Sequence, residues 1–427
     1  MFHRRERILP ALMIAGALTL TAACGGGDNV GSDDGDGQVT LRFSWWGNDS
    51  RHELTQQAID LFEEKNPDIT VEPEFSDWDS YYDRLTTQMA SGKSPDVFAV
   101  EIRRLGEFAT RGTLADVGAL VNTGDLNEEV LASGNVNGTQ YAVPTGANTF
   151  AVTANLAVLE DAGVEPPDDA TWTWDDYIEL SAEITEATGA GVYGTQLSYN
   201  DAYLNIFAAQ RGESVYTDDG LGVSAETVAD WYRSHLGLID AQASPDAATS
   251  TEIGSTGIET SLVATNQGAL GMWWSNQLSA ITAGSGEEIE LLRMPKDPGA
   301  VSGGMFLQPT MFWTVSENSE RKEAAGKLID FLVNDPEAGA ILGSDRGLPM
   351  NATVLAEIES TLPEPDRMSL EFINTLGDEL SAPEPPPTGA GEIPPMLERY
   401  GEEVIFDRMS PQEAAEAFIA EASSTLG

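Results

Sequence analysis

The chain is short of cysteine and histidine, and these shortages exclude two classes of structure. Its 427 residues include one cysteine, Cys24, and three histidines, His3, His52 and His235. One cysteine cannot close a disulfide within the chain, and three scattered histidines form no cluster for a metal site. We therefore expect a fold that rests on its hydrophobic core and holds no metal ion.

Positive charge is also scarce. Against 70 Asp and Glu residues there are only 22 Lys and Arg, and the formal net charge is -48. Such a surface repels phosphate backbones, which excludes nucleic-acid binding. An anionic ligand would need a local basic pocket against this field. We interpret the acidity as a feature that keeps the protein soluble in a salty environment.

Catalytic motifs are missing as well. The sequence contains no HExxH, no GxSxG and no Walker A motif. Carboxylates are so numerous that no pair stands out as the dyad that a glycosidase requires. We predict a protein that is not an enzyme and needs no cofactor; the alternative is a surface-anchored enzyme that acts on polysaccharides.

The N-terminus has the features of a bacterial lipoprotein. Residues 1–23 predict a signal peptide, because a basic head precedes an apolar run that is too short for a membrane span. The run ends at Cys24, in a lipobox-like pattern that has Thr21 where Leu is favoured. We expect Cys24 to be acylated and residues 24–38 to form a lipidated flexible linker, rich in Gly and Asp. The protein would then be anchored at the extracytoplasmic face of the membrane.

After the linker, the hydrophobic period alternates between that of a strand and that of a helix. The expected order is strand 39–46, helix 53–67, strand 68–75, helix 78–92 and strand 95–101. This alternation is typical of a mostly parallel α/β sheet. A strand within 140–155 looks like a crossing between two lobes.

Signals for helix ends and breaks follow later in the chain. Thr173 with Asp176, and Ser410 with Glu413, predict capping boxes. The Pro/Gly-rich segment 382–395 predicts irregular structure.

Aromatic residues gather where strands end. Trp45 and Trp46 end the first strand, and Trp273 and Trp274 end a later apolar run. Ligands of parallel α/β sheets bind outside the carboxyl ends of strands, and an indole can cover the apolar face of a sugar. Because neighbours in a strand point to opposite faces, we expect one Trp of each pair to be buried and the other to face a cleft. The alternative is that these aromatics all belong to the core.

From residue 39 to the C-terminus the sequence resembles the family 1 solute-binding proteins, the extracytoplasmic sugar-binding proteins of ABC importers. The matching stretches are 44–52, 58–100, 111–120, 141–149, 159–177, 268–277, 316–339 and 345–351. The resemblance implies a two-lobed α/β fold of the periplasmic-binding-protein type II, with hinged lobes and a ligand cleft between them. The expected N-terminal lobe is 39–147 plus 287–318, and the expected C-terminal lobe is 148–286 plus 319–427.

The resemblance also implies roles for single residues. Aromatic platforms, polar contacts and a close backbone approach would be supplied by Trp46, Trp78, Tyr81, Glu101, Asn148, Trp273, Trp274, Gly304 and Arg346. For Arg346 a structural ion pair is the alternative, and for Gly304 a simple turn.

The resemblance implies that the protein captures an oligosaccharide and delivers it to the permease of an ABC transporter. It also implies a monomer, which is usual in this family. The order of aromatics is most similar to the subgroup that binds pectin-derived oligosaccharides. A uronate ligand would need Arg51, Arg103 or Arg346 as a cationic pocket. A binder of peptides or polyamines is a further alternative, since aromatic boxes and acidic surfaces suit cations.

Overall fold

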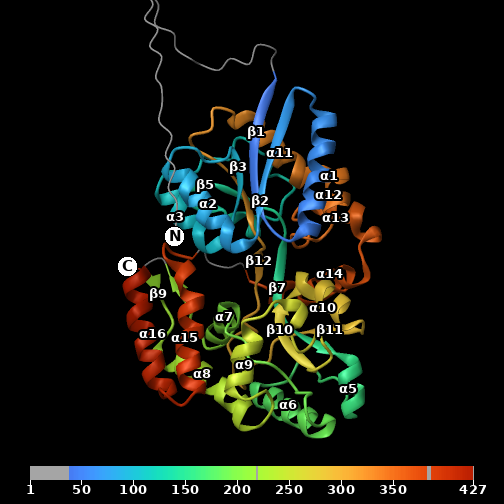
Figure 1. Ribbon diagram of the computed structural model, residues 1–427, viewed down its shortest axis with the longest axis vertical. Helices are drawn as coiled ribbons and strands as arrows, with labels where there is room; N and C mark the ends of the chain where they lie inside the picture. Colours follow the sequence, from blue (N-terminus) through green and yellow to red (C-terminus); the bar gives the residue numbers. More distant parts are fainter. Residues whose placement is uncertain (1–37, 218–219, 382–385, 427) are drawn as a thin grey trace, which may run out of the picture. The chain divides into compact units, whose positions relative to one another are not determined.

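The three strands predicted within residues 39–101 are neighbours in a five-stranded sheet (Figure 1). The computed structural model describes residues 38–217, 220–381 and 386–426; the predicted signal peptide and Cys24 lie outside them. The strands of this sheet, in the order β2-β1-β3-β13-β6, are β2 Ile69–Ser76, β1 Val39–Trp46, β3 Val97–Val100, β13 Phe312–Val315 and β6 Ala142–Pro144. The three predicted strands pair in parallel, and β13 runs antiparallel to both β3 and β6.

A second sheet is built around one fully buried strand. Its strands are β7 Ala147–Asn155, β10 Leu270–Trp274, β11 Ile289–Leu292 and β12 Leu307–Pro309. β10 and β11 flank the C-terminal half of β7, and β12 pairs with its first three residues, all antiparallel. β6 and β7 are separated by two residues but lie in different sheets, so the predicted crossing is present here.

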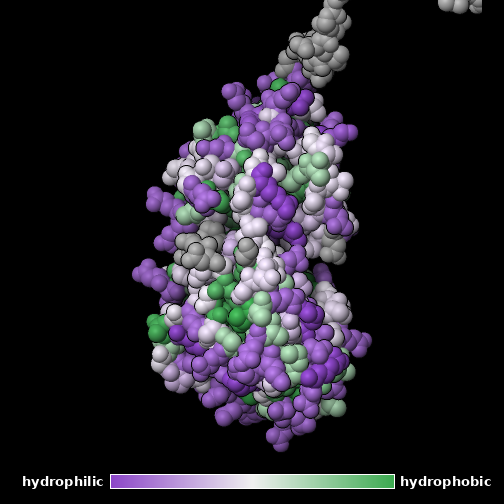
Figure 2. Space-filling view, turned by 90° about the vertical axis from the view of Figure 1, so that its left-hand side faces the viewer, coloured by the Kyte–Doolittle hydropathy of each residue, from purple (hydrophilic) through white to green (hydrophobic). Residues whose placement is uncertain are grey.

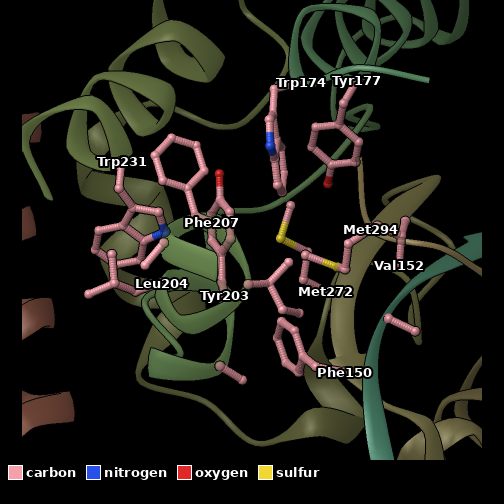
Figure 3. Packing of buried hydrophobic residues seen from close by; sticks show 14 of the residues in the cluster. Phe150, Val152, Trp174, Tyr177, Tyr203, Leu204, Phe207, Trp231, Met272 and Met294 are labelled. Atoms are coloured by element: carbon pink, nitrogen blue, oxygen red, sulfur yellow. The ribbon is translucent and has the colours of Figure 1, made fainter. Parts of the chain in front are cut away.

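Each sheet is the centre of its own hydrophobic core, and the two cores make the fold two-lobed. The first core includes helices α1 Asp49–Lys65, α2 Trp78–Ala90, α3 Ile102–Thr110, α11 Lys322–Asn334 and α12 Pro336–Leu342. The second includes α5 Leu156–Ala162, α6 Trp174–Thr188, α7 Asp201–Gln210, α8 Ala225–Asp240, α14 Glu364–Leu376, α15 Ile393–Ile405 and α16 Pro411–Leu426. Figure 3 shows how rich in aromatics the second core is: Trp174, Tyr203 and Phe207 face one another beside Trp231.

Shorter elements complete the fold. They are helices α4 Glu128–Ala132, α9 Ala247–Gly254, α10 Leu278–Ser285 and α13 Ala352–Ile358, the hairpins β4 Asn135–Val136 with β5 Thr139–Gln140 and β8 Tyr216–Thr217 with β9 Gly220–Leu221, and the 3-10 turns η1 Ile258–Thr260, η2 Ser275–Gln277, η3 Glu359–Thr361, η4 Gly377–Glu379 and η5 Ala390–Glu392. Within the described residues no helix has the length and hydrophobicity that a membrane crossing requires.

Two segments lie elsewhere than the sequence led us to expect. β11 was expected in the N-terminal lobe, yet it pairs with β7 in the second sheet. Helices α11 and α12 were expected in the C-terminal lobe, yet Ala325, Leu328 and Ala338 belong to the first core. The reason is which sheet each strand joins: β11 pairs with β7, whereas β13 pairs with β3 in the first sheet, and the helices that directly follow a strand tend to pack beside it.

The two expected capping boxes are present, but a segment that was expected to be irregular contains the start of a helix. Thr173 and Asp176 cap α6 reciprocally, and Ser410 and Glu413 do the same before α16. The segment 382–395 was expected to be irregular, but α15 begins at Ile393. Its two prolines occupy the first turn, where the missing N–H groups cost no helical hydrogen bond.

Candidate ligand-binding cleft

Residues of both lobes line a cleft of about 840 Å³. The first lobe contributes Trp78 of α2 and the start of α3, with Glu101, Arg103 and Arg104. The second contributes residues 196–200, the end of β10 and one face of α15. Four of the predicted ligand residues meet in this cleft: Trp78, Glu101, Trp273 and Trp274.

The indole of Trp78, which lines the cleft, packs edge-on against two aromatic rings of the same lobe. Trp78 is the first residue of α2 and is 43% exposed. Its ring meets Trp46 edge-on at 5.0 Å between centroids, and Tyr82 at 5.0 Å. Trp46 itself is buried at 7% exposure and does not line the cleft. Its ring therefore supports Trp78 rather than standing free at the surface.

Trp273 and Trp274 are neighbours at the end of β10, and both are partly exposed to the cleft. The ring of Trp274 packs edge-on against Phe150 at 5.2 Å and Phe306 at 6.1 Å. The indole N–H of Trp273 has no hydrogen-bond partner among the described residues. These two rings and Trp78 bring three indoles to one cleft.

The expected division of each Trp pair into one buried and one cleft-facing ring is wrong. Trp45 and Trp46 are both buried, because helices cover the first sheet on both faces and leave β1 no exposed side. Trp273 and Trp274 both reach the cleft, because β10 ends there and continues into the 3-10 turn η2.

A network of ion pairs joins the lobes at the floor of the cleft. Glu101 caps α3, and its carboxylate accepts from the Arg103 guanidinium at 2.5 Å. Arg103 also donates two bonds, at 3.0 and 2.8 Å, to Asp201 at the start of α7. Burial raises the pKa of the Glu101 carboxyl, although Arg103 opposes the change. Burial opposes ionisation of Arg103 too, but Asp201 and Glu101 raise its pKa, so Arg103 stays charged.

Two of the other predicted residues are buried in hydrogen-bonded positions away from the cleft. Tyr81 is fully buried, its hydroxyl donates to the Ala99 carbonyl at 2.7 Å, and burial raises its pKa. Asn148 is 5% exposed and donates to Asn276 at 2.6 Å. The carbonyl oxygen of the Asn148 side chain has no partner among the described residues.

Gly304 and Arg346 also lie outside the cleft. Gly304 lines a separate cavity of about 240 Å³, and a Cβ there would lie 2.5 Å from the Ile206 carbonyl oxygen. Arg346 is 4% exposed and donates to the Thr55 hydroxyl at 2.8 Å. Burial and the nearby Arg51 lower the pKa of Arg346 to about 9, which leaves it charged at neutral pH.

Sequence reasoning missed a group of cleft residues on α15 and on the loop before α7. Glu398 and Glu402 lie one turn apart on α15 and both line the cleft, as does Tyr199. The i, i+4 spacing of the two glutamates was a usable signal, but it followed a Pro/Gly-rich segment interpreted as irregular. Among the described residues no group of three or more His, Cys, Asp or Glu is placed to hold a metal ion.

Comparison with known proteins identifies the family. Residues 48–339 match the family described as bacterial extracellular solute-binding protein. The chain is 24% identical over 414 residues to a diacetylchitobiose binding protein of Streptomyces coelicolor, covering 93% of this chain and 90% of that protein.

Solved structures share the fold. An oligogalacturonide binding protein of Yersinia enterocolitica, in complex with saturated digalacturonic acid, is 22% identical with a TM-score of 0.78, covering 91% of this chain and 99% of that one. An ABC substrate-binding protein of Listeria monocytogenes, in complex with cycloalternan, is 21% identical with the same TM-score and the same coverage. The family match spans well over half of the chain, which therefore belongs to the bacterial extracellular solute-binding proteins.

Proposed function

We propose that this protein captures an oligosaccharide outside the cell and delivers it to the permease of an ABC transporter. It would be a lipoprotein held at the extracytoplasmic face of the membrane through Cys24, and it would bind its ligand without converting it. The family match supports a solute-binding role. Three similar proteins, described as binding diacetylchitobiose or as complexes with digalacturonic acid and cycloalternan, favour a sugar.

The observation that carries the proposal is the meeting of three indoles in one cleft. Trp78 comes from the first lobe, and Trp273 and Trp274 come from the second. Each ring can cover the C–H face of a sugar, a contact worth ~0.5–1.5 kcal/mol beyond the area it buries. Polar groups that line the cleft beside the rings, including the Glu101 carboxylate and the side-chain amides of Gln196 and Gln277, can bind hydroxyls.

Ligand binding would favour closure of the two lobes. A sugar that lies on Trp78 and Trp274 contacts both lobes at once, and it can do so only when the lobes are close together. Its affinity for the closed form is therefore higher, and binding shifts the population toward that form. The permease would recognise the closed, loaded protein.

The test is calorimetry with a panel of neutral, amino and acidic oligosaccharides. We expect at least one sugar to bind, and Trp78→Ala and Trp274→Ala each to weaken that binding at least tenfold, which corresponds to about 1.4 kcal/mol. The matched control is Phe75→Ala, because Phe75 is 46% exposed, close to the 43% of Trp78, but does not line the cleft.

Two results would reject the proposal. One is unchanged affinity in both tryptophan variants that remain folded. The other is turnover of labelled oligosaccharides during incubation with the wild-type protein, which would favour the polysaccharide-active enzyme.

A further inference from the structure

The arginines that a uronate would need are engaged elsewhere. Arg51 pairs with the Asp345 carboxylate at 2.8 Å and bonds its carbonyl at 2.9 Å. Arg346 is buried next to the same carboxylate. Neither residue lines the cleft. Arg103 does line it, but two carboxylates, Glu101 and Asp201, already accept its hydrogen bonds.

One guanidinium in the cleft has no ion-pair partner among the described residues. Arg104 lies over the ring of Tyr82, 4.5 Å from its centroid. Its charge is therefore already partly satisfied by the aromatic face. Among the described residues that line the cleft, Arg104 is therefore the candidate for binding an acidic sugar. The same lining contains three carboxylates, those of Glu101, Glu398 and Glu402.

Another part of the cleft lining carries two glutamates without an ion-pair partner among the described residues. Glu398 and Glu402 project from the same face of α15, one turn apart, and among the described residues neither forms an ion pair. Although part of Glu398 is exposed, its partial burial and the charge of Glu402 raise the pKa of its carboxyl. Repulsion between the two side chains is a cost that a cationic or hydrogen-bond-donating ligand would remove.

The hydroxyl of Tyr199, which lacks a hydrogen-bond partner among the described residues, is close enough to these glutamates to feel their charge. The Tyr199 ring stacks on His235 at 4.7 Å, and its hydroxyl has no hydrogen-bond partner among the described residues. Both Glu398 and Glu402 act electrostatically on this hydroxyl, and all three groups line the cleft. We call Tyr199, Glu398 and Glu402 the acidic wall. Its two carboxylates can accept hydrogen bonds from a ligand, whereas the Tyr199 hydroxyl is itself shielded from solvent.

The charges add up to a negative site. Carboxylates Glu101, Glu398 and Glu402 line the cleft and Asp201 adjoins it, against the guanidiniums of Arg103 and Arg104. The net charge of -48 over the whole chain adds a field of the same sign. Figure 2, which is coloured by hydropathy, shows hydrophilic residues over much of one face and a patch of hydrophobic residues near its middle. An anionic sugar would lose hydration free energy on entering the cleft, and few cationic groups there would compensate for that loss.

We propose that the cleft prefers amine-bearing or uncharged oligosaccharides and rejects uronates, and that Glu398 and Glu402 set this preference. The inference rests on the proposed function, since it names the class of sugar for the same cleft. It departs from the pectin-derived ligand that the order of aromatics suggested.

The experiment compares sugars of equal length that differ in charge. Glucosamine oligomers, their N-acetylated neutral counterparts and oligogalacturonides are titrated into the wild-type protein by calorimetry. We expect the amine-bearing or the neutral sugar to bind at least tenfold more tightly than the acidic one. Added NaCl should weaken only the amine-bearing ligand, because screening acts on its ion pairs.

Variants assign the preference to the acidic wall. In Glu398→Gln/Glu402→Gln we expect the amine-bearing sugar to lose at least tenfold in affinity, and the neutral sugar to change less than threefold. The matched control is Glu179→Gln/Glu183→Gln, which removes the same charge at the same spacing on α6, outside the cleft. Melting temperatures check that all variants are folded.

The outcomes separate the two proposals. Tightest binding of an oligogalacturonide, lost in Arg104→Gln, would overturn the charge preference and leave the sugar-binding role intact. Equal effects of the two double variants would also overturn it. Failure of every sugar to bind would overturn the proposed function and this inference with it.

Discussion

At the scale of single residues, the positions that the sequence marks as special divide into those that touch the cleft and those that hold the backbone. Gly304 belongs to the second kind. Its φ is +74°, and a Cβ would lie 2.5 Å from the Ile206 carbonyl oxygen. Both facts call for glycine regardless of any ligand.

We expect Gly304→Ala to lower the free energy of unfolding by about 1–3 kcal/mol, since a left-handed conformation with a side chain is strained. Chemical denaturation measures this change. Gly303→Ala is the matched control, because a Cβ at Gly303 meets nothing within 4 Å. Equal losses in the two variants would contradict the explanation.

The aromatic residues show which cleft positions can be predicted from the sequence and which cannot. Trp273 and Trp274 were predictable as cleft residues because ligand sites lie at strand ends and these rings follow an apolar run. Trp46 follows the same rule but is buried beneath α2. Trp78 and Tyr81 were expected from the family resemblance; Trp78 reaches the cleft and Tyr81 is buried. Whether a strand end opens to solvent depends on packing between distant segments, such as β13 with β3, which a local pattern does not contain.

At the scale of elements, helix α8 carries a buried histidine next to the loop that lines the cleft. His235 is 1% exposed, and its ring nitrogens lie 2.8 Å from the Trp231 carbonyl oxygen and 2.9 Å from that of Ser198. Burial lowers the pKa of His235 from its ordinary value, although the two carbonyl oxygens oppose the change, since a neutral ring can donate to only one of them. The folded protein therefore holds a neutral imidazole that takes up a proton more readily once unfolded.

Stability should then fall as the pH falls through about 6.5, the ordinary pKa of histidine, toward the lower pKa of the folded state. The extra slope is at most about 1.4 kcal/mol per pH unit for one proton. Denaturation between pH 5 and 8 should show a steeper loss in the wild type than in His235→Gln, where no proton is taken up. Identical slopes would exclude His235 as the cause.

The elements that sequence reasoning missed or misplaced have two causes. Helix α15 supplies the acidic wall, yet its first turn contains Pro394 and Pro395 and looked irregular. Proline breaks a helix only when it lies beyond the first turn, and the sequence alone does not say where the first turn falls. The misplaced segments β11 and α11 depend on which sheet recruits a strand, which is decided by tertiary pairing.

At the scale of the whole molecule, charge dominates. With 70 acidic and 22 basic side chains, most carboxylates have no cation to pair with. The folded chain brings these charges together, so their mutual repulsion opposes folding. Salt shortens the range of that repulsion from about 30 Å at 0.01 M to about 3 Å at 1 M.

We therefore expect the melting temperature to rise by several degrees between 0.01 M and 1 M salt. Scanning calorimetry in NaCl and in KCl provides the measurement, and the two salts should act alike if screening is the mechanism. A melting temperature that falls with salt would mean that surface ion pairs contribute more than the repulsion does.

The ion pair between Arg103 and Asp201 affects how readily the two lobes separate. It ties α3 of one lobe to α7 of the other through two hydrogen bonds that do not involve a sugar. Any separation of the lobes must break both bonds and rehydrate two charged groups that are largely shielded from water. The bridge therefore favours the close arrangement of the two lobes even when no ligand lies between them, and opening carries an energetic cost that is independent of the ligand.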